Sequence, residues 1–93
     1  MQKLDEILED RGLIYGDFGE GIKTEVAIMS LIETRYSEFH GKQMPMLYKT
    51  WISKYAMKLS RLAVSPMHID SHRDIGGYAE LICIELTKEK DNA

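Results

Sequence analysis

The residues with the most suggestive chemistry lie in the last third of the chain, where cations and carboxylates follow one another closely. Lys58 and Arg61 are three positions apart, and Asp70 and Asp74 follow after a short break. Two carboxylates near a helix start could hold Mg²⁺, which favours one or two protein carboxylates together with substrate phosphates. The same pair could instead cap the helix and interact favourably with its dipole. Magnesium binding and helix capping are therefore both open interpretations of Asp70 and Asp74.

Lys54 extends the cations into a stripe. It precedes Lys58 by four residues, and Arg61 follows three residues later, so the three side chains share one helix face. Such a stripe could clamp a phosphate, to which arginine gives a planar, two-pronged contact. The alternative, which the residues alone favour, is an internal network in which Arg61 pairs with Asp74 or Asp70 across a helix hairpin.

A second candidate is the stretch from residue 12 to residue 21, which contains four glycines. Glycine-rich loops can bind phosphate through their backbone amides. This stretch lacks the G-x-x-x-x-G-K-S/T pattern and follows no predicted strand, so neither a Walker nor a Rossmann loop is expected. The favoured prediction is a tight turn that buries Tyr15 and Phe18.

Zinc binding and cysteine catalysis are not expected. The three histidines have no zinc-site spacing, and the single cysteine, Cys83, supplies no second thiolate. Cys83 lies in an apolar run, which predicts a packing role.

The elements that must position these residues are helices. Hydrophobic periodicity predicts helices over residues 2–10, 22–39 and 45–64, and a fourth from Ser71 to about residue 86, with residues 87–93 fraying. No stretch alternates as a strand does. The sequence therefore predicts one all-α domain over residues 1–93, a small antiparallel helical bundle of about four helices.

Two local features refine this prediction. The third helix carries an apolar stripe at helical spacing: Tyr48, Ile52, Tyr55, Leu59 and Leu62. In the fourth, Ser71 and Asp74 fit a capping box, and Gly76-Gly77 would cost about 1 kcal/mol per glycine relative to alanine. A helix that keeps both glycines is expected to approach another backbone or a ligand there.

Size and charge limit the function. A chain of 93 residues buries only about 60–65% of its unfolded surface, so we expect a homodimer formed through the second or third helix. A net charge of −3 argues against broad nucleic-acid binding. No apolar run approaches the ~18 residues of a membrane span, so a cytoplasmic, non-membrane protein is expected.

Three motifs in order resemble a domain family of phages and prophages whose function is unknown. They are R-x-x-x-Y-G-D at residues 11–17, K-x-x-R at residues 58–61 and D-S-x-x-D-I-x-G-Y-A at residues 70–79. The likeness runs from about residue 8 to residue 86, and the family is all-helical and distantly similar to MazG-like nucleotide pyrophosphatases. The resemblance implies a phosphate or metal pocket around Lys58, Arg61, Asp70 and Asp74. The candidate ligand-binding residues are Tyr15, Gly16, Asp17, Lys58, Arg61, Ser71 and Tyr78.

The chain departs from the MazG-like pattern of an E-x-x-E pair on one helix and an E-x-x-D pair on the next. It has Glu6-x-x-Glu9 only in the first predicted helix, and no E-x-x-D. We therefore expect a phage-type accessory protein that binds a nucleotide or phosphate ligand, or a host protein, with catalysis absent or slow. The alternatives are a Mg²⁺-dependent nucleoside-triphosphate pyrophosphatase and an inhibitor of a host defence or nucleic-acid enzyme.

Overall fold

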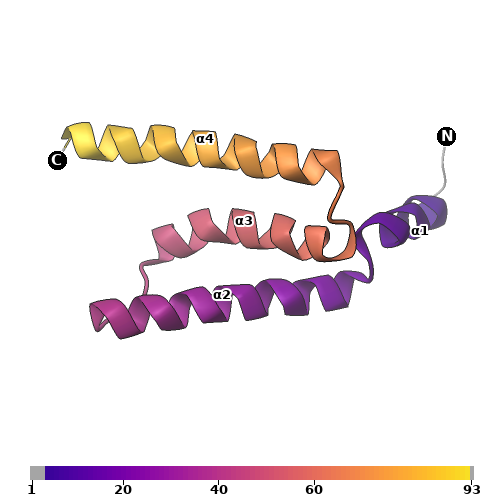
Figure 1. The fold of residues 1–93 in the computed structure, drawn as a ribbon, viewed down its shortest axis with the longest axis horizontal. Helices are drawn as coiled ribbons and strands as arrows, with labels where there is room; N and C mark the ends of the chain where they lie inside the picture. The colour runs from indigo at the N-terminus through magenta and orange to yellow at the C-terminus, as the bar shows by residue number, and fades with distance from the viewer. Residues whose placement is uncertain (1–3, 93) are drawn as a thin grey trace.

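A computed structural model describes residues 4–92, and this part of the chain is all-α. Its four helices are α1 (Leu4–Tyr15), α2 (Phe18–His40), α3 (Met46–Val64) and α4 (Ile69–Asn92). The predicted fold class is therefore confirmed (Figure 1). Within the described residues, no helix combines the length and the apolar character that crossing a bilayer requires.

Three of the helices form a single layer (Figure 1). α3 lies in the middle with α2 on one side and α4 on the other, each antiparallel to it, and within the described residues α2 and α4 do not pack on each other. α1 packs on α3 and α2 at one end of the layer. The molecule is accordingly elongated, with extents of 50 × 27 × 23 Å.

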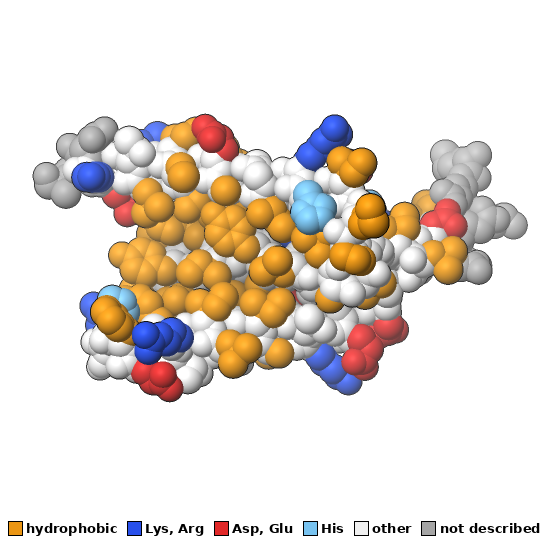
Figure 2. All heavy atoms as spheres, in the orientation of Figure 1, with side chains coloured by type: hydrophobic (Ala, Val, Ile, Leu, Met, Phe, Trp, Pro, Cys, Tyr) orange, Lys and Arg blue, Asp and Glu red, His pale blue; other side chains and the backbone are white. Residues whose placement is uncertain are grey.

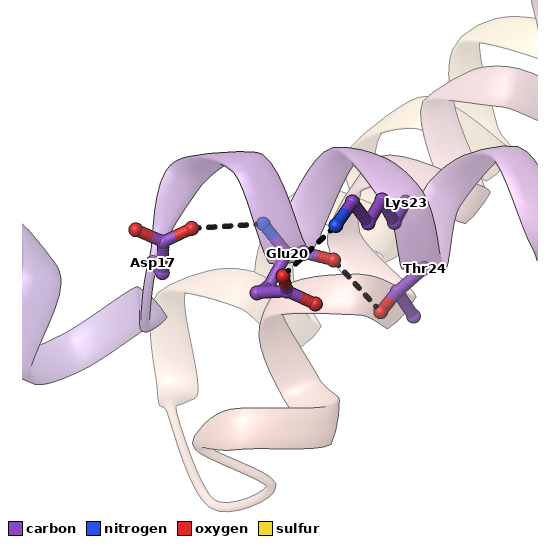
Figure 3. A network of polar contacts seen from close by, with 4 residues as sticks. All are labelled: Asp17, Glu20, Lys23 and Thr24. Carbon is purple, nitrogen blue, oxygen red and sulfur yellow. Dashed lines mark hydrogen bonds and ion pairs between the residues drawn. The ribbon is translucent and has the colours of Figure 1, made fainter.

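The predicted tight turn in the glycine-rich stretch is present at Gly16 and Asp17, and helix occupies the rest of that stretch. α2 begins at Phe18, where the Asp17 carboxylate accepts a hydrogen bond from the Glu20 backbone N–H at 3.0 Å. Figure 3 shows how Glu20 continues the network, with its carboxylate 3.1 Å from the Lys23 ammonium and its carbonyl accepting from the Thr24 hydroxyl. These local contacts stabilise the first turn despite its glycines. Phe18, predicted to be buried, is 82% exposed.

Only Gly16 and Asp17 connect α1 to α2. Gly16 has a φ of +78°, and its N–H donates to the Gly12 carbonyl at 2.9 Å, which closes the C-terminus of α1. The turn packs on the end of α3, since a Cβ at Gly16 would lie 3.0 Å from Val64 Cγ2. Ser65, directly after α3, donates its hydroxyl to the Ile14 carbonyl.

The predicted capping box in the fourth helix is also wrong. α4 begins at Ile69, and His68 Nδ1 accepts the Ser71 backbone N–H at 3.3 Å, so the histidine occupies the capping position. Ser71 is buried in the first turn, its hydroxyl 2.8 Å from the same nitrogen. The helix also continues to Asn92, past its predicted end near residue 86.

Two further expectations about α4 find no packing partner among the described residues. A Cβ at Gly76 or at Gly77 would meet nothing within 4 Å, so no other backbone of the described residues approaches these glycines, and an approach by a ligand stays a prediction. Cys83, predicted to pack, is exposed.

Candidate functional site

The ends of three helices meet around Tyr15, the last residue of α1. The Arg61 guanidinium carbon lies 4.5 Å from the centre of the Tyr15 ring, a cation–π contact between α1 and α3. His68, just before α4, contacts the same ring edge-on at 5.5 Å. Tyr15 thereby fixes the position of Arg61 relative to the start of α4.

A buried lysine, Lys58, makes an ion pair in this region. Its ammonium lies 2.7 Å from the Asp74 carboxylate, and its side chain is only 8% exposed, against 50% for Asp74. The hydrogen bond from Lys58 lowers the pKa of the Asp74 carboxyl below its ordinary value, and the positive charges of Lys58 and Arg61 act in the same direction. This ion pair connects the middle layer helix α3 to α4.

The predicted pairing of Arg61 with Asp74 or Asp70 is therefore wrong. Lys58 and Arg61 are three residues apart, so they leave α3 in directions that differ by about 60°. Because of this difference, Lys58 contacts Asp74 of α4, whereas Arg61 contacts Tyr15 of α1. None of the ion pairs among the described residues involves Arg61.

The carboxylates suit a resident magnesium ion poorly. Asp70 is exposed and Asp74 is held by the Lys58 ammonium, with which a cation would compete. Within residues 4–92, no three His, Cys, Asp or Glu side chains that the structure describes are grouped as metal ligands. The side chains of Glu6 and Glu9 lie outside the described part of the chain.

A pocket of about 310 Å³ opens between α1 and α3. It is lined by Ile7, Asp10, Arg11, Ile14, Tyr15 and Arg61. Of the predicted ligand-binding residues, Tyr15 and Arg61 line this pocket. Arg11 was missed as a site residue, although its spacing of four from Tyr15 places both on one face of a helix.

The other predicted ligand-binding residues do not line the pocket. Gly16 ends α1 and Asp17 caps α2. Ser71 is engaged with His68, and Tyr78 is half-buried two turns further along α4.

Comparisons of the chain with protein-family models, with curated proteins and with solved structures find no match.

Proposed function

We propose that this chain is a homodimeric, cytoplasmic binding module that takes a phosphate-bearing ligand of the nucleotide class in the pocket between α1 and α3. The observation that carries the proposal is the pair of arginines in the pocket lining, Arg11 and Arg61. Neither takes part in any ion pair among the described residues. Among the lining residues that the structure describes, there are two guanidinium groups and one carboxylate, that of Asp10, so this part of the lining is net positive, which suits an anion.

The chemistry of the lining supports a phosphate in particular. A guanidinium presents parallel N–H donors that match two oxygens of one phosphate. The ring of Tyr15 holds Arg61 in place, which lowers the entropy cost of ordering that side chain on binding. Ile7 and Ile14 give the pocket an apolar wall on which the non-phosphate part of a nucleotide can lie.

Binding has more support than hydrolysis. The pyrophosphatase alternative needs carboxylates free for Mg²⁺, whereas the Asp74 carboxylate is engaged by a buried ammonium. The resemblance to phage domains adds the expectation that the ligand is one met during infection.

The test is a thermal-shift screen followed by calorimetry, with inorganic phosphate, nucleoside monophosphates and nucleoside triphosphates, each with and without Mg²⁺. A ligand that binds the native state raises the melting temperature by mass action. Arg61→Gln and Arg11→Gln are expected to abolish that rise. Arg35→Gln is the matched control, because Arg35 also contacts an aromatic ring, that of Phe39 at 5.9 Å, but does not line the pocket.

Two results would contradict the proposal. One is the failure of every phosphate compound to raise the melting temperature. The other is an unchanged shift in Arg61→Gln. Release of pyrophosphate in the same samples would instead favour the enzyme.

A further inference from the structure

The layer of three helices leaves one broad hydrophobic surface uncovered. Figure 2 shows it as a continuous area of hydrophobic side chains that extends over α2, α3 and α4, with charged groups toward its edges. Its centre is the predicted core stripe of α3, of which Tyr48 is 39% exposed and Leu59 is 45% exposed. We call this surface the apolar face.

The position of the stripe follows from the two ion pairs that tie α3 to its neighbours. Lys49 reaches Glu33 of α2 at 2.9 Å, and Lys58 reaches Asp74 of α4 at 2.7 Å. An α-helix turns about 100° per residue, so nine residues put these two lysines about 180° apart, on opposite flanks of α3. Tyr48 and Leu59 point between the flanks, away from both neighbouring helices. The stripe therefore has no partner within the layer.

The residues whose burial is described enclose almost no core. Among the residues whose burial is described, the buried hydrophobic residues are Met44 and Ala56. A domain normally buries the apolar side of one layer of secondary structure against a second layer. The described residues contain a single layer with α1 at its end.

The solvent-exposed surface area of the chain indicates how large an uncovered interface would be. The chain exposes 7266 Å², whereas a folded monomer of this mass exposes about 5,500 Å². The excess of about 1,800 Å² per chain corresponds to about 3,600 Å² for two chains, which lies within the range of obligate homodimer interfaces.

We infer that a second copy of this chain covers the apolar face, so that two three-helix layers stack face to face. A two-fold interface brings the same patch against itself, so the patch must be self-complementary. The stripe at the centre of the face carries no charge, so no like charges meet there. Tyrosines in the stripe also suit an interface core, where aromatic residues are enriched.

This inference rests on the homodimer of the proposed function but uses a surface other than the ligand pocket. Leu59 and Arg61 are two residues apart, so their directions on α3 differ by about 160°. The pocket lined by Arg61 and Tyr15 therefore lies away from the apolar face and stays open when the second copy is bound.

Sedimentation equilibrium and thermal melting over a range of protein concentrations test the inference. We expect a mass of twice 10.7 kDa and a melting temperature that rises with protein concentration, because dissociation accompanies unfolding. Leu59→Glu should remove the dimer, and Leu59→Gln, without a charge, should weaken it at least tenfold. Met67→Glu is the control, since Met67 is 89% exposed outside the helices and the substitution introduces the same charge.

If Leu59→Glu does not fold, the dependence of the unsubstituted chain's melting temperature on protein concentration still tests the inference. A cooperatively melting 10.7-kDa monomer at all micromolar concentrations would overturn the inference. So would a dimer that survives both Leu59 substitutions unweakened, or a parent chain that is monomeric and unfolded alone. Loss of ligand binding in Arg61→Gln with an intact dimer would concern the pocket only, which separates the two proposals.

Discussion

At the scale of single residues, the buried ammonium of Lys58 is the feature that most constrains the molecule. Its side chain is 8% exposed, and the half-exposed carboxylate of Asp74 at 2.7 Å is its counter-charge. Removing one partner of a pair is costly when the remaining charge is buried. Lys58→Met leaves the half-exposed Asp74 carboxylate in contact with water, whereas Asp74→Asn leaves the buried Lys58 ammonium without its counter-charge. Lys58→Met should therefore be tolerated better than Asp74→Asn.

The same pair predicts how stability depends on pH. Because the pKa of Asp74 in the folded chain lies below its ordinary value of 3.8, the unfolded chain takes up its proton first as the pH falls. The stabilisation that ionised Asp74 gives the folded chain is complete above the pKa of the unfolded chain. It disappears as the pH drops through the lower pKa of the folded chain. We expect the melting temperature of the parent to exceed that of Asp74→Asn at pH 6 and the difference to shrink toward pH 2.5. Asp70→Asn is the control, because Asp70 is exposed and outside the ion pairs of the described residues; an equal difference at both pH values would contradict the role of Asp74.

At the scale of elements, periodicity in the sequence was sufficient to predict four helices and their order. Hydrophobic periodicity indicates which residues share one face of a helix, and this pattern does not depend on how the helices pack together. The helix starts were less predictable, because they depended on side chains that compete for the same amides. Asp17 began α2 within a glycine-rich stretch, and His68 took the capping position expected for Ser71.

The glycines provide the prediction at this scale. Gly16→Ala should lower the free energy of unfolding by about 1–3 kcal/mol, because alanine strains at positive φ and its Cβ would crowd Val64 at 3.0 Å. Gly77→Ala should act in the opposite direction and raise it by about 0.8–1 kcal/mol, since Gly77 lies inside α4 with open space around a Cβ. Urea denaturation at one protein concentration measures both changes. An equal rise in the free energy of unfolding in both variants would show that alanine is not strained at position 16.

The candidate site was predictable only in part. The sequence indicated Tyr15 and Arg61, which do line one pocket, but it assigned to Arg61 the carboxylate that Lys58 holds. Lys58 and Arg61 are three residues apart on α3, and this spacing directs them to different neighbouring helices. Which helix each one reaches depends on where α1 and α4 pack against α3. Arg11 was not predicted as a site residue for the same reason. The order of the helices in the chain does not show that α1 lies against the end of α3.

At the scale of the whole molecule, the elongated layer implies an uneven distribution of stability. α3 packs on α2, α4 and α1, whereas α1 packs only at the end of the layer. Amides open most easily where few buried contacts hold the helix. With a second copy on the apolar face, α3 becomes the most enclosed helix of the assembly.

Native-state hydrogen exchange should resolve this order. We expect amides of α3 to exchange slowest and those of α1 fastest, since α1 makes the fewest packing contacts in the layer and takes no part in the apolar face. Leu59→Gln should accelerate exchange in α2, α3 and α4 together, because each loses the covering layer at once, while the rates in α1 change little. Met67→Glu should leave the pattern of the parent intact. Uniform rates across the four helices, or acceleration confined to the turns around residue 59, would show that the layer is stable without a second copy.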